Sequence, residues 1–330
     1  MNPIALITDQ YYVYWNAIVI ALGVAACFCL TMALFTAHGG RAVAVWLLLP
    51  LGILFSLPLA RFFYWFCAGV DSNQTLWQAL TDYSSGNYYL VGVVLGTSLA
   101  ALVVRALGFT QNLPRLFDCL APGAALGIAL IRLSEIFTVS DRSEVPVSNP
   151  LFQRLPFGVF GPGQWRYATF FFQFVMMLLI FVLLMRFFVK RRRWPMKQNQ
   201  PRDGHVALMF VTWLSALDLV TDSSRYDASK MQNINGFVKL VQIAAAVALL
   251  TVLIIYSVRS IRANGLRPSL WVLWIVFFVA LGLAGFLEWL VQRKWNWYLL
   301  CYSLMSLSML TICFINYRAY LSVCAKPDRR

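Results

Sequence analysis

Charged side chains are scarce in this sequence. Only 12% of its 330 residues are Asp, Glu, Lys or Arg, whereas 60% are hydrophobic, and the mean hydropathy is +0.69. A water-soluble chain carries about 25% charged residues, so this chain lacks the polar side chains that cover a surface in water. The deficit excludes a soluble globular protein and indicates that lipid surrounds most of the chain.

The groups that serve metal sites and soluble enzymes are also few. There are two histidines, His38 and His205, and seven cysteines, which form no CxxC pair and lie near neither histidine in the sequence. Zinc and disulfide chemistry are therefore not predicted. The sequence also lacks the GxGxxG, Walker A, GxSxG and HExxH motifs. We expect no metal and no other cofactor.

What the sequence does contain is a series of apolar runs, each long enough to cross the roughly 30 Å hydrocarbon core of a bilayer. They predict an all-α polytopic membrane protein with about nine transmembrane helices. The fourth and sixth runs carry charged residues, so a broken or tilted helix is the alternative there. The nine runs cover residues 15–36, 43–67, 89–108, 116–137, 167–189, 204–221, 235–258, 269–290 and 297–317.

The basic residues predict the orientation of these helices. A dense group of Lys and Arg at 190–202 follows the fifth run and should face the cytoplasm, which places the N-terminus outside. Arg293 and Lys294, in an outer loop, are the exception, and we expect Glu288 to pair with one of them. Cytoplasmic basic loops explain the net charge of +14, so no nucleic-acid partner is expected. No basic segment precedes Arg41, so no cleavable signal peptide is expected.

Several ionisable residues lie in or beside the predicted helices, where each costs about 2.5–3.5 kcal/mol to insert. The predicted orientation brings them to one depth, near the outer lipid headgroups. Guanidinium groups donate paired hydrogen bonds to phosphate, so this group predicts a phospholipid headgroup site. Local pairing of Arg132 with Glu135 and of Asp222 with Arg225 is the alternative. The residues are Arg61, Arg132, Glu135, Arg166, Asp218, Asp222 and Arg225.

The stretch from Asp118 to Leu133 resembles part of a known family. Asp118-Cys-Leu-Ala-Pro122 is followed about ten residues later by Arg132-Leu133. This pattern is similar to the Asp-x-x-Ala-Pro element and the Gly-Arg-Leu-Gly-Asn signature of prolipoprotein diacylglyceryl transferases.

Two further positions fit the same family. Arg61, in Ala-Arg-Phe-Phe-Tyr, resembles the arginine of a Gly-Arg-x-x-Tyr element, and Gln242 resembles the glutamine of a Gly-Gln element. The resemblance covers about residues 10–262. It implies a seven-helix, diacylglyceryl-transferase-like membrane domain over residues 1–262, and it leaves residues 263–330 as an additional two-helix extension.

The resemblance implies a transferase that moves a diacylglyceryl group from phosphatidylglycerol to a prolipoprotein cysteine at the outer leaflet of the bacterial cytoplasmic membrane. Its partners would be a phosphatidylglycerol-like phospholipid and a prolipoprotein signal peptide. A thiolate attacks a glyceryl carbon and expels a glycerol phosphate, which needs a cation for the leaving group and a base for the thiol proton. We assign these roles to Arg132 and to Glu135 or Asp218. The candidate substrate-binding residues are Arg61, Asn87, Tyr89, Arg166, Asp222, Arg225 and Gln242.

The chain also departs from the family pattern. Glu135 stands where the signature has Asn, and Asn87-Tyr-Tyr89 stands where the family has His-Gly-Gly. In the sixth helix the family pattern has two arginines. When Arg225 is matched to the second of them, Asp218 stands where the pattern has the first. These departures favour a second hypothesis, a non-catalytic or altered-substrate relative that binds phospholipid or a membrane partner. A transporter or channel is the third, since intramembrane charges mark ion pathways, although no repeat symmetry supports it.

Overall fold

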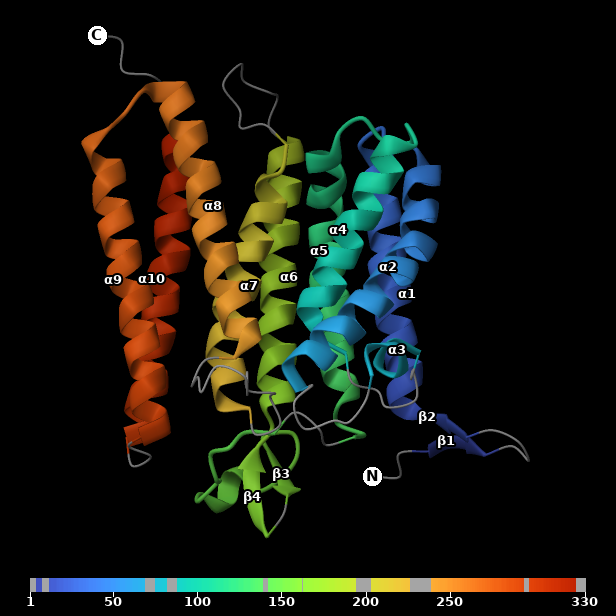
Figure 1. Cartoon of the computed structure of the whole chain (residues 1–330), viewed down its shortest axis with the longest axis vertical. Coiled ribbons are helices and arrows are strands. Elements are labelled where there is room, and N and C mark those ends of the chain that lie inside the picture. Colours follow the sequence, from blue (N-terminus) through green and yellow to red (C-terminus); the bar gives the residue numbers. More distant parts are fainter. Residues whose placement is uncertain are drawn as a thin grey trace.

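The structure is a computed structural model that describes nine segments of the chain. Long helices dominate these segments, and two short antiparallel strand pairs lie at one end of the helical bundle (Figure 1). The described segments are residues 4–7, 12–68, 75–81, 88–138, 142–161, 163–193, 203–225, 239–293 and 297–324.

The long helices follow the apolar runs of the sequence. They are α1 Trp15–Ala37, α2 Ala42–Ala68, α4 Leu90–Ala106, α5 Leu113–Ser134, α6 Thr169–Arg193, α7 His205–Ser224, α8 Leu240–Asn264, α9 Pro268–Arg293 and α10 Tyr298–Cys324. The short elements are β1 Ile4–Ile7, β2 Tyr12–Tyr14, α3 Leu76–Thr81, the 3-10 turn η1 Pro150–Phe152, β3 Gly158–Gly161 and β4 Gln164–Tyr167.

The prediction of an all-α polytopic membrane protein is confirmed. Within the described segments, eight helices are long and apolar enough to cross a membrane, and α4 is a shorter apolar helix of 17 residues. The two helices for which the sequence allowed a break, α5 and α7, are both continuous. Charged residues therefore do not break these helices, and their side chains must find partners within the protein.

Successive long helices run in alternating directions (Figure 1). We call the end of the bundle that holds α3 and the four strands the strand end. The ends of α2 and α5 that carry Arg61 and Arg132 lie there, as does Arg225 at the end of α7, whereas Arg41 lies at the opposite end. The alternation thus groups the residues that the sequence assigned to the outer side.

Two glycines allow α4 to pack directly against α2. A Cβ atom on Gly92 would lie 2.3 Å from the backbone nitrogen of Ala60, and one on Gly96 would lie 2.4 Å from the Cα atom of Ser56. Ser56 also donates a hydrogen bond of 3.1 Å to the backbone oxygen of Val93. Small residues and interhelical hydrogen bonds hold helices together in lipid, where burial of apolar side chains contributes little.

Asp118 caps the first turn of α7. Its carboxylate is buried and accepts hydrogen bonds from the backbone nitrogens of Gly204 (2.7 Å) and Ala207 (2.9 Å). A carboxylate at this position satisfies N–H groups that have no partner within the helix and interacts favourably with the helix dipole. The aspartate of the Asp118–Pro122 element therefore fixes α7 against α5 at the end of the bundle opposite the strand end.

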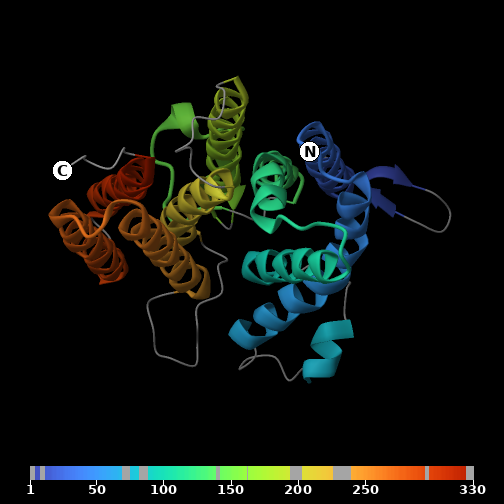
Figure 2. The same ribbon diagram turned by 90° about the horizontal axis from the view of Figure 1, so that it is seen from above.

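The last two helices pack against each other and against α7 and α8. Figure 2 shows α9 and α10 at one side of the bundle and α1 at the other, with α5, α6 and α7 between them. Three polar contacts anchor the pair away from the strand end. They are Trp274 to Ser257 (3.1 Å), Asn264 to the backbone oxygen of Ser322 (2.7 Å) and Asn316 to Thr212 (3.4 Å).

We predict that Gly96→Ala will destabilise the protein, because its new methyl group overlaps the α2 backbone. Overpacking of this kind costs about 1–3 kcal/mol. The measurement is the thermal unfolding midpoint of purified protein in detergent. Gly282→Ala is the matched control, since a Cβ atom there meets nothing within 4 Å and alanine favours a helix over glycine by about 1 kcal/mol. Equal unfolding midpoints for the two variants would contradict the packing described.

Candidate functional site

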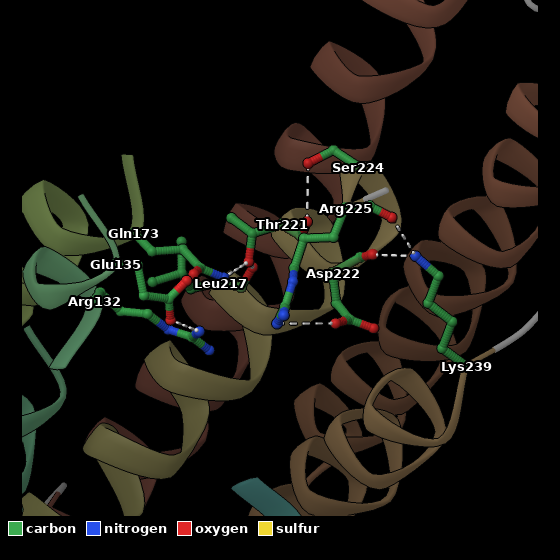
Figure 3. Close-up of polar contacts among 9 residues, drawn as sticks. All are labelled: Arg132, Glu135, Gln173, Leu217, Thr221, Asp222, Ser224, Arg225 and Lys239. Atoms are coloured by element: carbon green, nitrogen blue, oxygen red, sulfur yellow. Dashed lines mark hydrogen bonds and ion pairs between the residues drawn. The ribbon is translucent and has the colours of Figure 1, made fainter. Parts of the chain in front are cut away.

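The strand end of α5 carries an ion pair. Arg132 lies in the last turn of the helix and Glu135 is its C-cap residue. A guanidinium nitrogen of Arg132 lies 3.0 Å from a carboxylate oxygen of Glu135, and the two side chains are only 15% and 16% exposed (Figure 3). The local i, i+3 pair that the sequence allowed is therefore formed. Its partial burial leaves both groups within reach of a ligand that enters from the strand end.

A second pair lies at the strand end of α7. Asp222 is buried, and one of its carboxylate oxygens lies 3.7 Å from a guanidinium nitrogen of Arg225, the residue that follows the helix. Figure 3 shows the Arg225 side chain folded back along the helix end toward Asp222. Each of these two arginines thus has a carboxylate at i, i+3 spacing, which supports the pair by local geometry alone.

Lys239 joins this second pair from the residue that precedes α8. Its ammonium group donates hydrogen bonds to the backbone oxygens of Asp222 and Arg225 (Figure 3). The side chain is 1% exposed. The carboxyl end of a helix carries partial negative charge on carbonyls without helical partners, and a cation there is stabilising. Lys239 therefore caps the end of α7 and ties it to the start of α8.

The charge of Lys239 depends on its neighbours. Burial lowers the pKa of its ammonium group, while the carboxylates of Asp222, Glu288 and Glu144 oppose that change by attraction. A buried ammonium needs such compensation, because loss of water is costly for an ion. Sequence analysis did not select Lys239, since a single lysine before an apolar run is an ordinary helix flank.

Gln242 supports Lys239 from the first turn of α8. Its buried side-chain oxygen accepts a hydrogen bond of 2.9 Å from the backbone nitrogen of Lys239. The contact closes the N-terminus of α8 and fixes the direction in which the lysine side chain leaves the helix. Gln242, a predicted substrate-binding residue, is thus connected to the Asp222–Arg225 pair through Lys239.

Gln173 connects α6 to α7 between the two ion pairs. Its side-chain nitrogen donates a 2.7 Å hydrogen bond to the hydroxyl of Thr221, which in turn donates to the backbone oxygen of Leu217 (2.9 Å). One turn before Gln173, Phe170 belongs to an apolar cluster against which Ile136 packs. The strand ends of α5, α6 and α7 therefore meet, and Arg132 and Arg225 lie on neighbouring helices (Figure 3).

Arg166 holds the loop that precedes it. It lies in β4, and one guanidinium nitrogen donates to the backbone oxygens of Ser143 (3.2 Å) and Glu144 (3.0 Å). The backbone nitrogen of Glu144 donates to the backbone oxygen of Ser224 at 2.8 Å. We call residues 142–149, which precede η1, the strand-end loop. Through these contacts Arg166, predicted to bind substrate, fastens this loop to the last turn of α7.

Arg61 belongs to a different part of the strand end. It is 2% exposed, and its Nε donates a 2.9 Å hydrogen bond to the backbone oxygen of Ala79 in α3. Its guanidinium carbon also lies 5.9 Å from the ring centre of Tyr64 and 5.7 Å from that of Tyr88, within the range of a cation–π interaction. Arg61 therefore ties α2 to α3 and to the segment before α4.

The remaining candidates are placed as follows. Tyr89 is buried at the start of α4, and its backbone nitrogen donates to the backbone oxygen of Ala60 at 3.2 Å. Asp218 is half-buried in α7, one turn before Asp222. Asn87 lies outside the described residues. The described contacts thus pair Asp222 with Arg225 and connect Gln242 to them through Lys239. They place the Arg132–Glu135 pair on the adjoining helix and associate Arg61 and Tyr89 with α2, α3 and α4.

Glu288 is a further buried carboxylate at the strand end. Its described partners are the Ser223 hydroxyl, which donates to one carboxylate oxygen, and the Gln292 amide, which donates to the other at 3.2 Å. The expected pairing with Arg293 is wrong, because that side chain stacks on Trp289 instead, with 5.0 Å between guanidinium carbon and ring centre. Lys294 lies outside the described residues.

Within the described segments, no group of three or more His, Cys, Asp or Glu side chains is arranged to hold a metal ion. The fold and the site define a polytopic α-helical membrane protein with partly buried arginine–carboxylate pairs at one end of its bundle. Residues 3–258 match the prolipoprotein diacylglyceryl transferase family, and the chain belongs to that family. It is a multi-pass membrane protein of a transferase family that serves lipoprotein biosynthesis, as the sequence resemblance predicted. A search of the curated proteins finds no match.

We predict that Lys239→Met will strongly destabilise the protein, since it removes the buried cation that bonds to the end of α7 and attracts the neighbouring carboxylates. Removal of one partner from a buried ionic group costs about 3–5 kcal/mol. Thermal unfolding in detergent measures the effect. Arg293→Met is the matched control, because Arg293 is exposed and an exposed charge contributes about 0–1 kcal/mol. If both variants unfold at the wild-type temperature, Lys239 does not hold the end of α7.

Proposed function

We propose that this protein transfers a diacylglyceryl group from phosphatidylglycerol to the cysteine thiol of a prolipoprotein, at the outer leaflet of the bacterial cytoplasmic membrane. The observation that carries the proposal is the half-buried Arg132–Glu135 pair at the junction of α5, α6 and α7. By the sequence resemblance, Arg132 corresponds to the arginine of the family signature, and the chain belongs to this transferase family. The donor lipid and the signal peptide of the acceptor would both reach this junction from the membrane.

The proposed reaction needs a cation and a base in one place. The acceptor sulfur forms a bond to a glyceryl carbon while the bond from that carbon to a phosphate oxygen breaks, and glycerol phosphate leaves. Arg132 would stabilise the negative charge on the departing phosphate. The thiol proton would pass to Glu135 or to Asp218 before or during attack. Arg132 and Glu135 lie at the strand end of α5, and Asp218 lies within α7, one turn before Asp222.

The ion pair gives this chemistry a starting arrangement. In the structure Glu135 accepts the hydrogen bond from Arg132. An incoming phosphodiester offers the same guanidinium group a competing anion with suitable geometry. When phosphate takes the guanidinium, Glu135 loses its cationic partner and becomes a better proton acceptor. Substrate binding would thereby prepare the base.

The other candidate residues divide by their contacts. Arg225 can offer a second guanidinium to the headgroup by the same exchange with Asp222. Gln242 and Arg166 position that pair through Lys239 and the strand-end loop. We propose Arg61 and Tyr89 as residues of the wall on the α2–α4 side, and Asn87 as a further substrate-binding residue.

The transfer reaction tests the role of Arg132 directly. We expect Arg132→Ala to reduce transfer from phosphatidylglycerol to a lipobox peptide by at least about 100-fold, the usual cost of one charge-stabilising group. Arg132→Lys should recover little, because an ammonium lacks the planar paired donors of guanidinium. Mass spectrometry of the peptide gives the product.

The control is Arg154→Ala, which removes an exposed arginine from the same end of the bundle and should leave transfer unchanged. Wild-type activity in Arg132→Ala would remove Arg132 from the mechanism. Binding of phosphatidylglycerol without any transfer by the wild type would favour the second hypothesis, a lipid-binding relative. The absence of the family's histidine, and of the arginine at the position of Asp218, supports that hypothesis.

The proposed orientation has its own test. With the N-terminus outside, the strand end faces outward. A membrane-impermeant maleimide should therefore label Arg154→Cys in intact cells, above the signal of the wild-type cysteines. Arg41→Cys is the matched variant, exposed at the opposite end of the bundle, and should react only after permeabilisation. The reverse pattern of labelling would overturn the outer-leaflet assignment.

A further inference from the structure

The two helices outside the family match contribute to the candidate site. The match ends at residue 258, before α9 and α10. Glu288 of α9 is 4% exposed and accepts a hydrogen bond from Ser223, the neighbour of Asp222 in α7. Tyr302 of α10 donates to the backbone oxygen of the same serine at 3.4 Å. Both helices therefore contact the turn of α7 that carries the Asp222–Arg225 pair.

The charges at this turn require a second carboxylate. Two cations, Arg225 and Lys239, lie close to Asp222. Glu144 and Glu288 also act on the Lys239 ammonium, and the attraction from Glu288 is the larger of the two. Without Glu288, the Lys239 ammonium would attract the Asp222 carboxylate more strongly and draw it away from Arg225.

Anchoring alone does not explain a carboxylate at this place. The α9–α10 pair is already attached by the Trp274, Asn264 and Asn316 contacts. A buried ion is costly and an apolar residue of similar size anchors a helix at least as well. Glu288 contacts Ser223, the neighbour of Asp222, and its negative charge attracts the Lys239 ammonium. Its charge therefore acts on the Asp222–Arg225 pair.

We propose that Glu288 is a positioning residue of the transferase site, supplied by the two-helix extension. It shares the charge of Lys239 and holds Ser223, so that Asp222 stays directed at Arg225 and the arginine is presented for a lipid phosphate. This inference rests on the proposed function for its substrate, phosphatidylglycerol. It makes the extension part of the site rather than an appendage to the family domain.

Kinetic measurements on purified full-length protein test the role of the charge. Glu288→Gln keeps a side-chain oxygen for the Ser223 hydroxyl but removes the negative charge. We expect its KM for phosphatidylglycerol to rise about tenfold, a normal size for coupling between adjacent sites, with kcat near wild type. Its unfolding midpoint should fall as well, because buried Lys239 loses one of its carboxylates. Glu288→Ala loses both features and should show the same KM effect with reduced stability.

The control for anchoring is Trp274→Phe, which removes the hydrogen bond to Ser257. It should lower the unfolding midpoint without a change in KM. A wild-type KM in Glu288→Gln overturns the proposal. It is also overturned if Glu288→Ala behaves like Trp274→Phe, with a lower unfolding midpoint but a wild-type KM.

Calorimetric titration with a short-chain phosphatidylglycerol separates this inference from the proposed function. If the wild type binds the lipid but transfers nothing, the proposed reaction fails, and a Kd about tenfold weaker in Glu288→Gln still supports the positioning role. An unchanged Kd in that variant overturns it. If the wild type neither binds nor transfers, both proposals fail.

Discussion

The end of α7 is held by one buried cation, and the arrangement of the site follows from that contact. Lys239 donates to the backbone oxygen of Asp222, in the last turn of α7, and to that of Arg225, the residue that follows the helix. Because this ammonium is out of water, carboxylates must surround it. Asp222 and Glu288 meet that need from two helices. The same helix end receives the strand-end loop through Glu144 and Ser224. One helix terminus thus organises α7, α8, α9 and the loop after α5.

Periodic and local features of this protein were predictable from the sequence, whereas partners distant in sequence were not. Apolar runs gave the helices, and i, i+3 spacing gave the Arg132–Glu135 and Asp222–Arg225 pairs. Spacing says nothing of which helices meet, so it did not reveal the role of Lys239. It offered Arg293 or Lys294 as the partner of Glu288 and did not find the contact with Ser223. The partners of these buried charges are set by tertiary packing alone.

The local pairs also change how a lipid phosphate would be recognised. An arginine within the membrane without an anionic partner raises the free energy of the protein. Arg132 and Arg225 therefore each have a carboxylate within one helical turn. A phosphate must then replace a carboxylate rather than fill an empty position. Such an exchange makes binding weaker but more selective, because a ligand without an anionic group cannot displace Glu135 or Asp222.

Charged residues of α7, α8 and α9 compensate one another where the chain departs from the family pattern. Asp218 stands where the resemblance places an arginine, so α7 has one cation fewer and one carboxylate more than expected. Lys239 supplies a buried cation beside the next turn of the same helix. That ammonium in turn needs the second carboxylate that Glu288 brings from α9. Lys239, Asp222 and Glu288 therefore form one buried group at the end of α7, because each of these charges requires the others for burial.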